Sequence, residues 1–271
     1  MPSIIGNLFF KINGIFAGQK CCQGFYQFLH TISLQGMNVG MGSLVESSGE
    51  RYVIKYIKDA QGGNSSITVF DVGANVGDFA YTVQNILGQS ATIFCFEPKK
   101  STFDALKMRF SDVENPKLFN FGFGNKQETV TLYFDRDPEK SGLASVYPRN
   151  LDHFGIYLKE QETIQLTTID TFCQENDINN INFLKMDVEG HEISVLNGAK
   201  RMINADAITN ILFEFGGCNI DSRTFFQDFY YLLKDKYHIY RVLQDGLFPI
   251  SEYREIYEIF LTTNFLAVHK Q

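Results

Sequence analysis

A short apolar run that breaks into a glycine turn constrains this chain more than any other feature. Ile67, Val69 and Phe70 have the β-branched and aromatic character of a buried strand. The segment 71–78 follows with the pattern Asp-x-Gly-x-x-x-Gly and then opens a helix. Glycines permit a tight turn and the close approach of a ligand to the backbone. An acid and a glycine turn at the end of a strand are typical of a ligand crevice at the carboxyl edge of a parallel sheet.

The segments around this turn alternate between strand and helix character. Amphipathic spacing predicts a helix over 78–87, an apolar run predicts a strand over 91–96, and a second helix and strand are expected at 101–110 and 117–121. This order predicts an α/β fold with a doubly wound, mostly parallel sheet. Further elements are expected as strands at 181–186, 208–215, 237–243 and 262–268, and as helices at 51–60, 168–175, 191–203 and 223–234.

The apolar period changes after the third strand. Residues 129–134 alternate as in an antiparallel strand, and 163–166 supply a pairing partner, which predicts a β-hairpin insertion. The polar stretch 135–161 between them has the length of a lid over the sheet edge. Arg149 and His153 in this stretch face either a substrate or solvent.

Length and composition indicate one large domain with a sizeable core. The chain has 271 residues, of which 44% are hydrophobic and 20% charged. We expect residues 1–60 to form an N-terminal helical appendage and residues 61–271 to form the main domain. The net charge of −7 argues against nucleic acid as a partner, because binding to a phosphate backbone needs clustered cations. The phenylalanines fall mostly in apolar segments, so we expect them in the core.

The cysteines indicate a reducing compartment. Their number, five, is odd, and they contain no Cys-x-x-Cys pair. This pattern disfavours a disulfide framework and a zinc site, and it favours a cytoplasmic protein.

The first residues carry an apolar stripe at helical spacing between Ile4 and Phe16. The stripe is too short and too polar for a membrane span and lacks the basic start of a signal peptide. We expect a helix that packs on the domain. Membrane contact through this helix and a homodimer formed by it are the alternatives.

The glycine turn favours a nucleoside ligand without phosphates. A dinucleotide fingerprint needs a glycine where this chain has Asn75, and no Walker loop is present. Glu97 ends the next strand, where a carboxylate accepts hydrogen bonds from both hydroxyls of a ribose. An exposed acid in a strand-to-helix turn is the alternative for Glu97.

A second group of acids ends the strand predicted at 181–186. Asp187 and Glu189 follow it, on the same sheet edge as Asp71 and Glu97, and alternation places Lys185 on the same side as both. For Glu192, a role at this edge and a structural role are equally good explanations, because helix N-termini also prefer acids.

Together these residues resemble the FkbM family of S-adenosylmethionine-dependent methyltransferases. The resemblance implies a class I methyltransferase fold with an antiparallel last strand. It also implies O-methylation of a hydroxyl on a sugar, a glycan or a polyketide-like natural product, so the partner is a small-molecule or glycan acceptor. The matching stretches, in family order, are 71–77, 96–98, 166–170, 185–192, 195–199 and 213–214.

The resemblance also implies roles for single residues. The methionine end of the cofactor is cradled by the turn, Glu97 holds the ribose, and Asp187 lies near the transferred methyl. Asn120–Asn125 departs from the commoner family version after the third strand, where adenine contacts are expected. The implied cofactor-binding residues are Asp71, Gly73, Asn75, Gly77, Glu97, Pro98, Gly122 and Asp187.

The catalytic base stays open among Asp187, Glu189 and His191 at this point. His191 has the most suitable ordinary pKa, and Glu214 ends a neighbouring strand where it can line the acceptor site. Asp187 with Glu189 or Glu214 offers oxygen ligands for a divalent cation, but acids on one edge serve without a metal, and we expect none. A nicotinamide-dependent oxidoreductase and a non-catalytic binding module are the competing functions.

Overall fold

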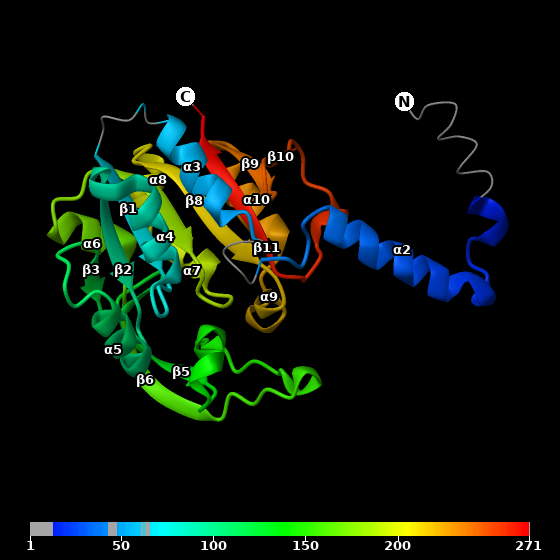
Figure 1. Ribbon diagram of the computed structural model, residues 1–271, viewed down its shortest axis with the longest axis horizontal. Coiled ribbons are helices and arrows are strands. Elements are labelled where there is room, and N and C mark those ends of the chain that lie inside the picture. Colours follow the sequence, from blue (N-terminus) through cyan, green and yellow to red (C-terminus); the bar gives the residue numbers. More distant parts are fainter. Residues whose placement is uncertain (1–12, 43–47, 61, 63–65, 271) are drawn as a thin grey trace.

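A large twisted sheet lies between two layers of helices, with a smaller sheet at one end (Figure 1). The structure, a computed structural model, describes residues 13–42, 48–60, 62 and 66–270. In spatial order the large sheet consists of β10 (Leu247–Ile250), β9 (Tyr237–Val242), β11 (Thr263–His269), β8 (Ile208–Phe215), β7 (Ile181–Met186), β1 (Ile67–Val72), β2 (Ala91–Phe96) and β3 (Lys117–Phe119).

The pairing confirms the predicted fold class. Strands β3, β2, β1, β7 and β8 are parallel, and β11 lies antiparallel between β8 and β9. The chain order reverses between β1 and β7, which is where ligands bind in doubly wound sheets. The edge strand β10 was not predicted. It contains Pro249, which an edge position tolerates because one side of the strand needs no hydrogen-bond donor.

Alternation along the strands builds two cores. In β1, Ile67 and Val69 pack under one helical layer, whereas Phe70 and Val72 pack under the other. Asp71 therefore shares the face of Ile67 and Val69. The first layer contains α3 (Glu50–Ala60), α4 (Asp78–Leu87) and α5 (Lys100–Arg109), and the second contains α6 (Ile169–Glu175), α7 (Glu192–Asn197), α8 (Lys200–Asn204) and α10 (Phe226–Leu233).

Phenylalanines fill the second core, as the sequence predicted. Phe172 on α6 packs edge-on against Phe96, with ring centroids 5.0 Å apart, and also against Phe70 and Phe119. Edge-to-face packing of this kind adds to the gain from burying the rings.

The predicted hairpin is part of a three-stranded sheet. β5 (Glu128–Phe134) pairs antiparallel with β6 (Glu160–Thr167), and β4 (Gly122–Phe123) adds a parallel strand to β6. The connection between β5 and β6 contains two short 3-10 helices, η3 (Pro138–Leu143) and η4 (Asp152–Phe154). The chain thus leaves the large sheet after β3, so the strand predicted over 117–121 ends at Phe119.

The helix predicted over 191–203 is two helices. Gly198 separates α7 from α8, and a Cβ at this position would lie 2.0 Å from the carbonyl oxygen of Gly124. The carboxylate of Asp170 accepts hydrogen bonds from the backbone N–H groups of Arg201 and Met202 and so caps α8. This close packing between distant segments is not visible in the local apolar period.

The N-terminal part has two kinds of structure. The stripe between Ile4 and Phe16 lies mostly outside the described residues. Its last part, residues 13–16, is described and is helical. Helix α2 (Gln23–Gly36), after the 3-10 helix η1 (Lys20–Cys22), projects from the body of the molecule (Figure 1). Helix α3 packs in the same core as β1 and β2 of the large sheet. The predicted boundary at residue 60, between the appendage and the main domain, therefore lies between elements that share one core. Among the described residues, no helix has the length and apolar character needed to cross a membrane.

The remaining elements are short and complete the path of the chain. They are η2 (Gly88–Ser90), α9 (Cys218–Ser222) and η5 (Glu255–Tyr257).

Candidate active site

The glycine turn after β1 is held against β2 and β7. The backbone N–H groups of Gly73 and Ala74 both donate to the carbonyl of Phe96, at 3.0 Å. Gly73 has a φ of 78°, and a Cβ there would lie 1.9 Å from the carbonyl oxygen of Asp187. Only glycine fits such an approach, and the result is a turn that presents backbone to the crevice.

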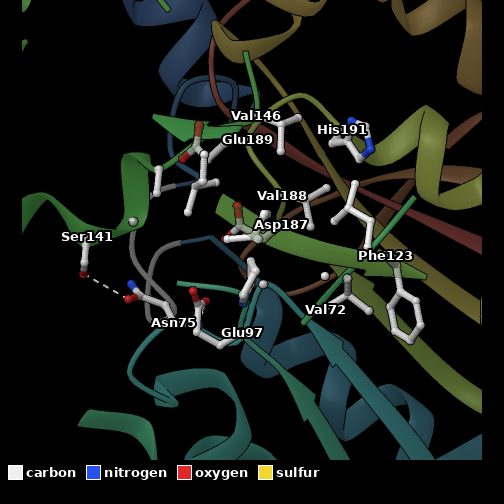
Figure 2. A pocket seen from close by; sticks show the side chains of 18 residues that line it. Val72, Asn75, Glu97, Phe123, Ser141, Val146, Asp187, Val188, Glu189 and His191 are labelled. Atoms are coloured by element: carbon white, nitrogen blue, oxygen red, sulfur yellow. Dashed lines mark hydrogen bonds between the residues drawn. The ribbon is translucent and has the colours of Figure 1, made fainter. Parts of the chain in front are cut away.

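Glu97 lies beside this turn, at the floor of a pocket (Figure 2). Its Oε2 accepts a hydrogen bond from the backbone N–H of Asn75 at 3.0 Å, and its Oε1 accepts one from Lys99 at 2.9 Å. Burial raises the pKa of Glu97 to about 7, against the lowering effect of these two bonds. The carboxylate is therefore fixed in place while free lone pairs remain for a ligand.

The pocket has a polar end and an apolar wall. The polar end contains Asn75, Glu97, Asp187 and Glu189, and backbone at Gly73 widens the crevice. The wall comes from strands of both sheets, from the segment after η3 and from the end of β7. Its apolar members are Val72, Phe123, Leu132, Ala144, Val146, Ile164, Leu166 and Val188. Pro98, Gly122 and His191 also line it.

Two predicted cofactor residues, Asp71 and Gly77, lie outside this lining. Asp71 is fully buried and points into the core under α4, where Lys185 on β7 is its register partner. Lys185 Nζ lies 3.4 Å from Asp71 Oδ1 and donates to the carbonyl of Gly73 at 3.3 Å. Gly77 packs against the ring of Phe110, where a Cβ would come within 2.6 Å. Both residues thus support the turn from behind.

Asp187 and Glu189 stand where β7 ends. The backbone N–H of Asp187 donates to the carbonyl of Val72 at 3.0 Å, and its carboxylate, 40% exposed, lies 3.5 Å from Lys185 Nζ. Glu189 has a φ of 51° and forms an ion pair with Arg149 from the insertion. Burial raises the pKa of Glu189, and the guanidinium of Arg149 opposes this rise. The two acids therefore differ, since only Glu189 is held by an arginine.

A second cavity of about 660 Å³ opens on the other side of these acids. It shares Asn75, Gly142, Asp187 and Glu189 with the first pocket. Its further polar residues include Arg149, His153 and Glu214. Its apolar residues include Leu143, Leu151, Phe154, Ile156, Ile220, Phe260 and Leu261. The two spaces thus meet at the carboxyl end of β7.

His191 and Glu192 have structural surroundings. The hydroxyl of Tyr147 lies 3.1 Å from His191 Nδ1, and burial lowers the pKa of His191 to about 4. A pKa this low makes the ring a weaker base than its ordinary pKa suggested. Glu192 is fully buried, and its Oε1 accepts hydrogen bonds from the backbone N–H groups of Val188 and Gly190. These bonds shape the loop that carries Glu189.

Several functional contacts were not predicted from sequence. Ser141 Oγ donates to Asn75 Oδ1 at 2.9 Å, so η3 closes over the glycine turn (Figure 2). Ser145 Oγ donates to the carbonyl of Glu189 at 2.8 Å. The only available signal was the length of the 135–161 insertion. Among the residues that the structure describes, no group of three or more His, Cys, Asp or Glu side chains is arranged to hold a metal ion.

The strand order, the glycine turn and Glu97 beside it define a methyltransferase of class I. Residues 71–242 match the methyltransferase FkbM domain, and this chain belongs to that family. S-adenosylmethionine is the methyl donor of the family. The pocket fits this cofactor. A fixed carboxylate suits its ribose, and the backbone-lined turn suits its methionine part. The apolar wall suits its adenine, and the further acids suit its cationic sulfur.

Two relatives with described activities are similar to this chain at low identity. The hexuronic acid methyltransferase AglP of Haloferax volcanii is 27% identical over 150 residues, which are 55% of this chain and 56% of the relative. The 2-O-methyltransferase NoeI of Sinorhizobium fredii is 22% identical over 142 residues, 50% of this chain and 58% of the relative. The chain thus spans less than two thirds of the length of these relatives.

Solved structures resemble the chain weakly. Fibrillarin from Aeropyrum pernix, with bound S-adenosyl-L-methionine, has a TM-score of 0.41 and 12% identity, over 75% of this chain and 67% of that one.

Proposed function

We propose that this protein is an S-adenosylmethionine-dependent O-methyltransferase that acts on a hydroxyl group of a sugar or glycan. The observation that carries this proposal is the junction of the two cavities at Asp187 and Glu189. A methyl donor in the first pocket and an acceptor in the second would meet at these carboxylates. Proximity of this kind supplies much of the rate of a bimolecular transfer.

The first pocket would hold the cofactor through a small set of residues. Glu97 would accept hydrogen bonds from the ribose, the Gly73–Asn75 turn would lie along the methionine part, and Pro98, Gly122 and Phe123 would border the adenine. Asp71 and Gly77 would support this turn from the core. When bound, S-adenosylmethionine supplies an activated methyl group.

Asp187 is the base that the geometry favours. It lines both cavities, and its carboxylate is not engaged by an arginine, whereas that of Glu189 is. It would accept the proton of the acceptor hydroxyl. The neutral His191 has a pKa of about 4 and is too weak a base for this step. Glu189, fixed by Arg149, would orient the acceptor.

The second cavity suits a saccharide better than a fully apolar natural product. Carboxylates of Glu189 and Glu214 accept hydrogen bonds from hydroxyl groups, and the rings of Phe154 and Phe260 can cover the C–H face of a sugar. The activities in the names of AglP and NoeI, hexuronic acid methylation and 2-O-methylation, support the same class.

Methyl transfer tests this proposal. The intact protein is incubated with methyl-labelled S-adenosylmethionine and a panel of neutral and acidic saccharides beside polyketide-like acceptors, and products are located by mass spectrometry. Label in an O-methyl group of a saccharide, lost in Asp187→Asn, supports the proposal. Label only in polyketide-like acceptors, or none in any acceptor while the cofactor binds, contradicts it.

A further inference from the structure

Helix α2 carries an apolar stripe on its exposed side. Phe25, Phe28, Leu29 and Ile32 follow the spacing that places residues on one face of a helix. They are 60%, 60%, 40% and 48% exposed. In Figure 1 this helix projects away from both sheets. Large apolar side chains that gather on one exposed face mark an interaction surface.

The helix is fixed to the body by its C-terminal end. Leu34, on the opposite side of the helix from the stripe, is the one buried residue of α2. Beyond it, Asn38 Nδ2 donates to the carbonyl of Val242 at 3.1 Å, and the backbone N–H of Gly42 donates to the carbonyl of Thr262 at 3.0 Å. This attachment turns the stripe outward, away from the body.

Residues 1–45 carry a net charge opposite in sign to that of the remaining chain. All 31 acidic residues follow Val45 in the sequence. The segment before it has Lys11 and Lys20, and α2 itself carries His30 as its titratable group beside Tyr26. Helix α2 has no charged side chain of its own apart from a protonated His30, so the charge of this part of the chain comes from Lys11 and Lys20. This acid-free, basic segment and the apolar face of α2 together complement an anionic lipid surface, from which the acidic body is repelled.

The stripe is small for a protein interface. A phenylalanine that is half exposed leaves roughly 100 Å² for a partner, so the four side chains offer on the order of 400 Å². A stable interface needs roughly 800 Å² from each partner. Somewhat more than half of such an interface is apolar, so a second copy would also have to bury a polar rim of similar area around this projecting helix. Insertion of four side chains into a headgroup region needs the apolar face alone, which favours the lipid surface as the occupant.

We propose that α2 is an interfacial anchor, with Phe25, Phe28, Leu29 and Ile32 inserted into the surface of an anionic lipid bilayer. The helix lies on the membrane and does not cross it. The short connection after Gly36 leads to Gly42, which lines the acceptor cavity. The anchor is therefore connected through a short segment to the wall of this cavity.

Vesicle flotation of the full chain tests this anchor. The protein is mixed with vesicles of phosphatidylcholine and phosphatidylglycerol, or of phosphatidylcholine alone, and the floating fraction is measured at low and high salt. We expect binding to the anionic vesicles that weakens with salt. The double variant Phe25→Ser/Phe28→Ser should lose about tenfold in vesicle affinity or more, because two large apolar side chains no longer insert.

The matched control is Met108→Ser/Ile256→Ser, which removes side chains that are 78% and 65% exposed elsewhere on the surface. It should float like the unchanged protein, and both variants should keep its melting temperature. Equal loss in both variants, or no flotation of the unchanged protein, overturns the proposal. Sedimentation adds one outcome: a dimer that Phe25→Ser/Phe28→Ser converts to monomer, without vesicle binding, would assign the stripe to a second copy.

Discussion

Asp71 and Lys185 are register partners on neighbouring strands, and their charged atoms lie 3.4 Å apart in the core. Their side chains are 0% and 7% exposed. The ammonium of Lys185 also reaches the carbonyl of Gly73 and the carboxylate of Asp187. This buried pair therefore connects the glycine turn with the proposed base, and Asp71 and Lys185 both lie outside the pocket itself.

Removal of the ammonium should destabilise the fold. Lys185→Met leaves Asp71 buried without a counter-charge, which typically costs about 3–5 kcal/mol in the free energy of unfolding. The control Lys100→Met breaks the ion pair with Asp104, whose partners are 65% and 53% exposed, and should cost less than about 1 kcal/mol. Urea denaturation measures both, and equal losses would refute a special role for the buried pair.

A methyl group added at Gly73 should disturb the structure of the turn far more than one added at a glycine with open space around it. Gly73→Ala would place a Cβ 1.9 Å from the carbonyl oxygen of Asp187, so the turn must move. The control is Gly88→Ala, which also has a positive φ, 58°, but nothing within 4 Å of the new Cβ. We expect Gly88→Ala to lose about 1–3 kcal/mol in the free energy of unfolding, from its positive φ alone, and Gly73→Ala to lose cofactor binding. Thermal unfolding with and without cofactor compares them, and similar behaviour of both variants would contradict the close approach.

The buried Glu192 should make stability depend on pH. Burial raises its pKa from 4.5 to about 7, so the folded protein binds the proton more tightly than the unfolded chain. The stability that the protonated group contributes is full below pH 4.5 and is lost as the pH rises to about 7. The expected loss is roughly 3 kcal/mol, at 1.36 kcal/mol for each pKa unit.

Glu192→Gln isolates this contribution. The amide oxygen can still accept from Val188 and Gly190, while its NH₂ replaces Oε2, which has no partner among the described residues. The free energy of unfolding of Glu192→Gln minus that of the unchanged protein should increase by roughly 3 kcal/mol from pH 5 to pH 8. A constant difference across this range would show that Glu192 does not titrate there.

Asp187 and His191, two of the three candidate bases, should differ in their effect on activity. Asp187→Asn should lower kcat by about 100-fold or more, as expected when a general base is lost. His191→Asn keeps a polar group near Tyr147 and should change kcat by less than about tenfold. Because the pKa of His191 is about 4, His191 should cause no inflection near pH 6.5 in the pH profile of kcat/KM. The profile near pH 6.5 should therefore be the same in His191→Asn and in the unchanged protein. The reverse order of the two losses would make His191 the base.

The fold was largely predictable because its signals are local. The strand at Ile67–Val72, the glycine turn and the change of period at residue 129 follow from spacing and side-chain type, and the structure has each of them. The break at Gly198 was missed because it depends on contact with Gly124, a segment far away in the sequence.

The candidate site was predictable at its strand ends only. Glu97 and Asp187 follow apolar strands, so their shared edge could be inferred. The surroundings of Asp71 could not be inferred, because they depend on the alternation within β1 and on Lys185 across the register. The contacts of Ser141 and Arg149 depend on how the insertion folds back, which no local pattern encodes.

Calorimetric titration with S-adenosylmethionine tests the central claim most directly. The intact protein should bind one cofactor per chain. Glu97→Ala should weaken this binding by about tenfold or more, because hydrogen bonds to a buried carboxylate are lost. Glu214→Gln, which changes the second cavity and not the first pocket, should bind S-adenosylmethionine like the unchanged protein. No binding by the intact protein, or equal affinity of Glu97→Ala and the unchanged protein, would contradict the assignment of the pocket at Asn75 and Glu97 to the cofactor.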